Sequence, residues 1–194
     1  MWDDNYPIPQ RRKNRLSGIR YSENGAYFIT ICTREHNNLF WKDATVYVPC
    51  GPVGAALRRP PDSAGTPAGA ALRRPPDHLN ANGTTIIREL DRFSEIYQGV
   101  ITVDNYVIMP NHVHLLLTIH PENLGGRRNA APTIPSVINQ FKGCVTKRIG
   151  FPCWQKSFHD HVVRNEDEYR RIWEYIDNNP AKWAEDRYYI PPGE

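Results

Sequence analysis

Two histidines one residue apart, His112 and His114, open an apolar run that continues to His120. Because side chains alternate in direction along a strand, both imidazoles should project from one face while Val113 projects from the other. Two imidazoles on one face of a rigid strand could hold a single metal ion close to the sheet. The alternative is a pair of ordinary sheet histidines that bind nothing, although two polar rings in such a place still need partners.

A second group of chemistry-bearing residues lies near the end of the chain, in the segment from Glu166 to Asn179. A helix turns about 100° per residue, so its apolar residues can be assigned to one arc of the surface. That arc holds Tyr169, Ile172, Trp173 and Ile176. We therefore expect Tyr169 to be a core residue, and Tyr175 to lie on the flank of the buried stripe, where a phenol can reach a cleft.

Tyr175 and Asn179 are four residues apart, and such pairs lie on adjacent turns of one helix face. Their side chains could converge on one point, where Asn179 offers a carbonyl oxygen to a metal and Tyr175 offers a phenol to a phosphate. The alternative is that Asn179 ends the helix before Pro180 and that Tyr175 is a surface aromatic.

A second His-x-His pattern is formed by His159 and His161 on either side of Asp160. The acid in the middle leaves no apolar residue to face the core, so this pair fits a metal site less well than His112 and His114. We expect His159 and His161 to support the site or to contact a ligand, rather than to bind the metal directly.

The elements that must position these residues follow from hydrophobic periodicity. Strands are predicted over Tyr27–Thr33, Val100–Met109, His112–His120 and Trp154–Val163. Helices are predicted over Thr84–Gln98, from the N-cap Thr133 to Ile149, and over Glu166–Asn179. The order β-α-β-β-α-β is that of a ferredoxin-like sandwich, an α+β fold with helices on one face of an antiparallel sheet, here followed by a C-terminal helix that carries Tyr175.

Residues 49–78 interrupt this pattern. The stretch from Gly54 to Asp62 recurs from Gly69 to Asp77, rich in proline, glycine and arginine. Two copies do not make a repeat architecture, and Pro-Pro prevents either copy from continuing as a helix. We interpret 1–194 as a single domain that carries a flexible insertion at 49–78 and a basic N-terminal arm at 1–20.

The bulk composition narrows the classes of protein. The formal net charge is +3, which permits a nucleic acid partner without requiring one. No apolar run reaches the roughly 18 residues of a membrane span, and the N-terminus lacks the apolar stretch of a signal peptide. We therefore expect a cytoplasmic protein with no membrane partner. The four cysteines show no C-x-x-C pairing, so we interpret them as reduced thiols.

With these elements in place, the chain resembles the single-tyrosine HUH transposases, most closely their REP-associated tyrosine transposase-like branch. The histidine–hydrophobe–histidine motif is His112-Val113-His114, within the typical string Met109-Pro-Asn-His-Val-His114. The Tyr-x-x-x-Asn motif of the family is matched by Tyr175 to Asn179. Further matching blocks run from Gly25 to Thr33 and from Trp154 to Trp183. The duplicated insertion is the main departure.

The resemblance implies a chemistry for these residues. Mg²⁺ or Mn²⁺ would be held by His112, His114 and Asn179, and Tyr175 would attack single-stranded DNA to form a 5′-phosphotyrosine. The substrate would be single-stranded or hairpin DNA from a repeat element. Basic side chains expected on the DNA phosphates are Arg11, Arg12, Arg15, Arg20, Lys142 and Lys147.

Two other functions remain open at this point: a catalytically silent DNA-binding protein, and a metal-dependent nuclease that uses water. The absence of a clustered carboxylate pair near the histidines argues against the nuclease. The sequence leaves open whether the protein is a monomer or a homodimer.

Overall fold

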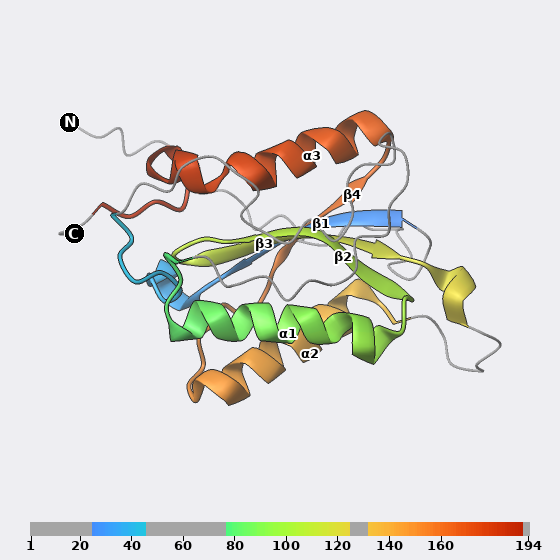
Figure 1. Ribbon diagram of the computed structural model, residues 1–194, viewed down its shortest axis with the longest axis horizontal. Helices are drawn as coiled ribbons and strands as arrows, with labels where there is room; N and C mark the ends of the chain where they lie inside the picture. The colour runs from blue at the N-terminus through green and yellow to red at the C-terminus, as the bar shows by residue number, and fades with distance from the viewer. Residues whose placement is uncertain (1–24, 46–76, 125–131, 192–194) are drawn as a thin grey trace, which may run out of the picture.

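The computed structural model describes residues 25–45, 77–124 and 132–191. A four-stranded sheet lies between two layers of helix (Figure 1). Helices α1 (Ala81–Tyr97) and α2 (Ile134–Ile149) cover one face, and α3 (Glu166–Asn178) runs across the other. The predicted α+β sandwich is therefore confirmed, with α3 added on the face that the two core helices leave uncovered.

The sheet has the strand order β2-β3-β1-β4, and every neighbouring pair is antiparallel. Its strands are β1 (Gly25–Cys32), β2 (Ile101–Ile108), β3 (His112–Ile119) and β4 (His159–Val163). This is the order of the ferredoxin-like arrangement that the element sequence predicts. Three short 3₁₀ helices complete the described chain: Arg34–His36, Pro121–Leu124 and Pro180–Glu185.

Register assigns each side chain of the central strands to one face. Cys32 pairs with His112 and Thr30 pairs with His114, so these four side chains share the face that α3 covers. Val113, by contrast, is fully buried and projects from the opposite face of the sheet by strand alternation, and α1 and α2 cover that face (Figure 1). The alternation predicted for the histidine strand is thus present, and it separates a polar face from the apolar core.

Helix α1 begins at Ala81, three residues before the predicted start, because Asn80 caps it. The Asn80 side-chain oxygen accepts hydrogen bonds from the backbone N–H groups of Asn82 and Gly83, at 2.9 and 3.0 Å. Gly83 packs so closely that a Cβ there would lie 2.5 Å from the Phe40 carbonyl oxygen. The Asn-Gly pair that resembles a turn in the sequence is therefore the first helical turn.

Helix α3 is held over the sheet by both apolar and polar contacts. Trp173 and Ile176 are its buried residues. The buried Asn105 of β2 donates its side-chain amide to the carboxylate of Asp177, at 3.0 Å. Asn165 caps the N-terminus by accepting from the backbone N–H of Glu168. Tyr169 is half-buried beside Trp173, as expected for a residue packed on the core.

The fourth strand is shorter than predicted. Trp154 forms only an isolated bridge with Thr33, and regular pairing begins at His159. Lys142 of α2 explains the difference: its ammonium donates to the backbone carbonyls of Gln155, Lys156 and Ser157, at 2.6, 3.1 and 3.4 Å. Carbonyls that converge on one ammonium cannot also form an extended ladder.

The prediction that Lys142 contacts DNA is therefore wrong. The side chain is 9% exposed, and its three donors are all directed to the 155–157 carbonyls. Burial also lowers the pKa of Lys142. Its role in this fold is to fix the loop that precedes β4.

We expect Lys142→Met to lower the free energy of unfolding by about 1–3 kcal/mol, because three part-buried carbonyls lose their charged donor. Urea denaturation would measure the loss. The exposed Lys147, on the same helix, provides the control: Lys147→Met should change stability by less than about 0.5 kcal/mol. Weaker DNA binding by Lys142→Met at unchanged stability would contradict this role.

The predicted insertion at 49–78 and the basic arm at 1–20 lie almost entirely outside the described residues. The chain on either side of the insertion is described, and Trp41 forms a bridge with Leu79. The two ends of the interruption therefore meet at one place in the fold. Within the described residues, no helix combines the length and the apolar character that crossing a membrane requires.

Candidate functional site

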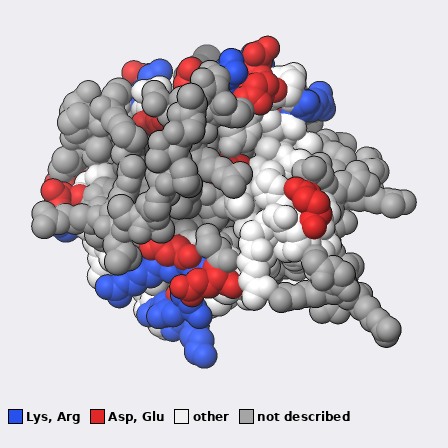
Figure 2. All heavy atoms as spheres, turned by 45° about the vertical axis from the view of Figure 1, so that its right-hand side comes forward, with Lys and Arg blue, Asp and Glu red and all other residues white. Residues whose placement is uncertain are grey.

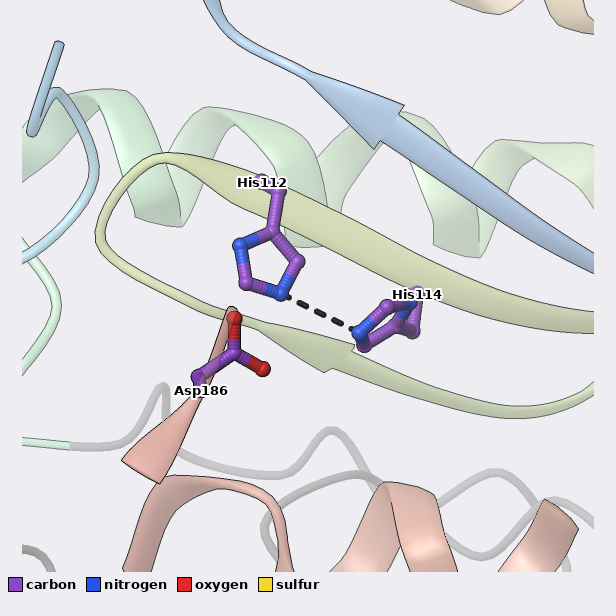
Figure 3. Close-up of side chains that lie close together, drawn as sticks. All are labelled: His112, His114 and Asp186. Carbon is purple, nitrogen blue, oxygen red and sulfur yellow. Dashed lines mark hydrogen bonds between the residues drawn. The ribbon is translucent and has the colours of Figure 1, made fainter. Parts of the chain in front are cut away.

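The imidazoles of His112 and His114 project from β3 toward each other and toward Asp186, which lies on the chain after α3 (Figure 3). The two Nε2 atoms are 3.1 Å apart. Both side chains are buried, with exposed fractions of 0% and 3%. Two ring nitrogens at this separation need a positive atom between them, either a proton or a cation.

The hydrogen bonds on the other side of each ring fix which nitrogen faces the site. His112 Nδ1 lies 2.9 Å from the Asn111 side-chain oxygen, and His114 Nδ1 lies 2.9 Å from the Thr30 hydroxyl. Asn111 uses its amide nitrogen to donate to two backbone carbonyls, so its oxygen must accept, and His112 Nδ1 must carry the proton. The Nε2 lone pair of His112 therefore points into the site, as in a metal-ligating histidine with an outer hydrogen-bond partner.

Asn111 also ties the site to the C-terminal segment. Its amide nitrogen donates to the carbonyl of His36 at 3.0 Å and to the carbonyl of Tyr188 at 2.8 Å. The Tyr188 ring lies 4.8 Å from the ring of His112. One fully buried side chain thus orients a histidine and positions residues 186–188 beside it.

We expect Asn111→Ala to weaken Mn²⁺ binding by about 10–100-fold, the usual cost of removing an outer partner of a ligating histidine. Isothermal titration calorimetry on the purified protein would measure it. Asn123→Ala is the control, because Asn123 is exposed in the 3₁₀ helix Pro121–Leu124, donates to the Gly99 carbonyl and does not contact the site. An unchanged affinity in Asn111→Ala would show that its hydrogen bond does not orient a ligand.

The electrostatic environment keeps both histidines neutral. Burial, together with the positive charge of Arg187, lowers the pKa of His114 to about 3. Burial lowers the pKa of His112 well below its usual value, and His114 and Arg187 lower it further. Both rings therefore keep their lone pairs at neutral pH, which is the state that a metal requires.

Tyr175 lies on the flank of α3 and reaches the same point. Its hydroxyl is 3.3 Å from His114 Nε2, although the residue as a whole is 45% exposed. Its ring packs edge-on against Phe28 and His114, at centroid distances of 5.9 and 5.3 Å. Burial and then Asp186 raise the pKa of the phenol, against smaller lowering effects of Asn179 and Arg187. The phenol therefore stays protonated until a cation lies beside it.

Asn179 follows α3 and is 4% exposed, and it lines the same cavity as Tyr175. Its side-chain oxygen is buried and has no hydrogen-bond partner. An orphaned carbonyl oxygen is costly unless something binds it. Asn179 is also the C-cap of α3, so both functions considered for it in the sequence analysis are compatible with the structure.

Asp186 is the residue that the sequence analysis missed. Possible metal-ligand atoms are those of histidine, cysteine, aspartate and glutamate side chains. Among the described residues, only the ligand atoms of His112, His114 and Asp186 form a group of three within 4.8 Å of one another. Its carboxylate faces the two imidazoles in Figure 3. Two neutral imidazoles and a carboxylate form a donor set that fits a divalent cation, and the unpartnered amide oxygen belongs to Asn179, which lines the adjoining cavity together with Asp186. Asp186 follows a 3₁₀ helix and belongs to no periodic pattern, so its position could not be read from spacing.

The second histidine pair lies on the same sheet face but serves other contacts. His159 pairs with Thr30 and His161 pairs with Phe28 across β1. His161 Nε2 is 2.7 Å from the Glu168 carboxylate, and His159 is exposed. Neither histidine joins the group around His112. Their expected supporting role remains a prediction.

Most of the basic residues predicted to contact DNA cannot be placed beside this site. Arg11, Arg12, Arg15 and Arg20 lie outside the described residues. Lys147 is exposed on α2, on the opposite side of the sheet. On the face shown in Figure 2, acidic and basic side chains of the described residues lie side by side, both along the top, where α3 runs, and at the lower left. This face carries no broad basic surface among the described residues.

The cavity beside Tyr175 does contain cations that the sequence analysis did not select. It has a volume of about 470 Å³. Its lining residues are Arg171, Glu174, Tyr175, Asn178, Asn179, Lys182, Glu185, Asp186 and Arg187. The phenol therefore opens onto a charged cavity large enough for part of a nucleotide chain.

Comparison with known proteins finds related sequences and related solved structures. An uncharacterised protein of Haemophilus influenzae is 27% identical over 204 aligned positions, covering 96% of this chain and 97% of the relative. A REP-associated tyrosine transposase of Escherichia coli is 32% identical over 81 residues, covering 41% of this chain and 44% of that protein. No family model matches the chain.

Among solved structures, a REP-associated tyrosine transposase bound to a REP hairpin superimposes with a TM-score of 0.52. The alignment has 18% sequence identity and covers 87% of this chain and 74% of that one. This likeness shows a shared fold. The resemblance to REP-associated tyrosine transposases that the motifs predict is thus confirmed, in sequence over part of the chain and in fold over most of it.

Proposed function

We propose that this protein is a metal-dependent single-tyrosine transposase that cleaves and rejoins single-stranded DNA through a 5′-phosphotyrosine intermediate. The observation that carries the proposal is the 3.3 Å approach of the Tyr175 hydroxyl to His114 Nε2, within a convergent and metal-compatible donor set. The similarity to REP-associated tyrosine transposases supports it.

The metal would be Mg²⁺ or Mn²⁺, held by His112, His114 and Asn179 as the family resemblance implies, with the Asp186 carboxylate close enough to join them. When bound, the ion would supply charge neutralisation at the scissile phosphate and favour the ionised phenol beside it. Imidazole ligands make Mn²⁺ as suitable as Mg²⁺ in vitro.

In the proposed reaction, the Tyr175 oxygen attacks phosphorus and its phenolic proton passes to solvent. A bond forms between this oxygen and phosphorus, the bond from phosphorus to the 3′-oxygen breaks, and the 3′-oxygen leaves with the electron pair and takes up a proton. The number of phosphoester bonds is unchanged. A 3′-hydroxyl of a second strand can therefore reverse the step and join the strands.

Other residues near the site would orient the metal ligands and the nucleophile. Thr30 and Asn111 orient the two imidazoles, and the packing of Phe28 and His114 around the Tyr175 ring holds the phenol at the site. The short contacts fix the nucleophile in place before DNA binds, so less orientation must be gained in the reaction.

The DNA partner is proposed to be single-stranded with a neighbouring hairpin, because the related solved structure holds a REP hairpin. The arginines of the 1–20 arm, together with Lys147, remain candidates for phosphate contacts, and His159 and His161 for contacts beside the nucleophile. We also propose the cytoplasmic location that the sequence analysis expects. Light scattering would measure the molar mass in solution and so distinguish a monomer from a homodimer.

The deciding experiment uses the full chain, Mn²⁺ and an oligonucleotide that carries a repeat hairpin and a single-stranded flank. With a label at the 3′ end, the protein should acquire the label covalently; with a label at the 5′ end, it should not. Chelation of the metal should abolish the transfer. Specific binding with no cleavage would support a silent DNA-binding protein instead, and cleavage without attached protein would support a nuclease that uses water.

A further inference from the structure

Arg187 follows Asp186 directly in the chain and is exposed at the charged cavity. Its side chain lines the cavity shared with Tyr175 and Asn179. Its guanidinium carbon lies 4.4 Å from the centroid of the Tyr188 ring, and its terminal nitrogen donates to the Tyr188 hydroxyl. The guanidinium is therefore held beside the ring that itself packs against His112.

The backbone around Arg187 is anchored on both sides. The Tyr188 N–H donates to the Asp186 carboxylate at 2.7 Å, and the Asp186 N–H donates to the Trp183 carbonyl at 3.0 Å. The Tyr188 carbonyl accepts from Asn111, which also orients His112. Arg187 thus projects from a segment whose position is tied to the histidine pair.

The charge of this side chain acts on residues from three elements. Its positive charge lowers the pKa of His112 and His114 on β3, of Tyr175 on α3, and of His159 on β4. Within the described part of the chain, no carboxylate lies within ion-pair distance of the guanidinium. A cation held by an aromatic ring and without an ion pair among the described residues, in a cavity that contains a candidate nucleophile, is suited to an anionic ligand.

We propose that Arg187 binds a non-bridging oxygen of the scissile phosphodiester and stabilises the charge that develops there during attack by Tyr175. The inference rests on the proposed function, which it extends with a residue outside both sequence motifs. The planar guanidinium can direct two N–H groups at a phosphate, whereas an ammonium acts as a point charge. Arg171 and Lys182 also line the cavity, whereas Arg187 is the cation held against Tyr188, whose ring packs on His112.

A test that does not depend on cleavage uses the Tyr175→Phe background with a chelator present, so that no metal ion contributes to binding of the phosphate. Two oligonucleotides are compared, one with an ordinary phosphodiester at the cleavage position and one with a neutral methylphosphonate there. With Arg187 present, the neutral linkage should weaken binding by about 10–100-fold, the value of one charge-assisted hydrogen bond. With Arg187→Gln, which keeps the side chain long and polar, the two oligonucleotides should bind equally.

Cleavage gives the second readout. In the protein with Tyr175 intact, Arg187→Gln should slow single-turnover cleavage of the phosphodiester by about 10²–10³-fold, as loss of one preorganised donor does elsewhere. On the methylphosphonate, the same substitution should have little effect. Arg92→Gln, a change to a cation of α1 on the opposite face of the sheet, should slow neither substrate more than about threefold.

The outcomes separate this inference from the proposed function. One outcome is that the methylphosphonate weakens binding by the same factor whether residue 187 is arginine or glutamine. That result overturns the phosphate contact even if the protein forms a tyrosyl adduct. Equal slowing of both substrates by Arg187→Gln also overturns it, because a merely structural role would not depend on phosphate charge. A linkage-specific binding effect without any adduct would support the contact while refuting the covalent chemistry.

Discussion

Tyr175→Phe is expected to abolish the covalent protein–DNA adduct, with a fall in cleavage rate of at least about 10⁴-fold, because it removes the attacking atom and leaves no equivalent nucleophile in place. The substitution deletes one oxygen from a residue that is 45% exposed, so the fold should persist. DNA binding should also persist. Denaturing gel electrophoresis with labelled DNA, followed by mass spectrometry of the modified peptide, measures the result.

Two other tyrosines serve as controls for this experiment. Tyr169 is half-buried against Trp173 on the same helix, and Tyr169→Phe should leave adduct formation intact. Tyr188 lies nearer the site, beside His112, and burial is the largest of the effects that raise its pKa to about 12. An adduct that survives in Tyr175→Phe and disappears in Tyr188→Phe would transfer the nucleophilic role to Tyr188.

His112→Gln and His114→Gln are each expected to weaken Mn²⁺ binding by more than about 100-fold, since loss of an outer hydrogen-bond partner alone costs 10–100-fold. The two Nε2 atoms lie 3.1 Å apart and face the Asp186 carboxylate, so either substitution removes one of a small set of converging donors. Calorimetry or Mn²⁺ electron paramagnetic resonance would measure the affinity, and the cleavage assay should show parallel loss.

The control for the histidine experiment is His120→Gln. His120 follows the same strand but bonds to Glu122 and Thr102, away from the site. Because His112 and His114 are buried, thermal unfolding must show that each variant still folds. A folded His112→Gln protein that binds Mn²⁺ as tightly as the unchanged protein would place the metal elsewhere and remove the basis of the proposed reaction.

Features that depend on only a few consecutive residues could be predicted from the sequence. The alternation around Val113 placed His112 and His114 on one face, and Pro110-Asn111 marked the hairpin turn before β3. Thr133 caps α2 as predicted, because its hydroxyl accepts a hydrogen bond from the Ser136 backbone. The 3.6-residue period placed Tyr175 on the flank of α3, where its phenol meets His114.

Other features depended on contacts between distant residues. Lys142 resembled a surface cation in the helix pattern, yet it lies against three carbonyls of the loop before β4. The predicted strand from Trp154 was shortened by the same contacts. Asn111 looked like a turn residue, and its hydrogen bonds to His112 and to the Tyr188 carbonyl appear only when the C-terminal segment lies beside the hairpin.

The sequence by itself determined the repeating geometry: which side chains share a strand face or a helix flank, and therefore that paired imidazoles, a phenol and an amide could meet. These relations hold because backbone geometry fixes them over a few residues. Only the tertiary structure decided that α3 covers the histidine face and that Asp186 and Arg187, from an aperiodic segment, lie within it. Burial and charge at the site arise from packing between residues far apart in the chain, and no local period encodes them.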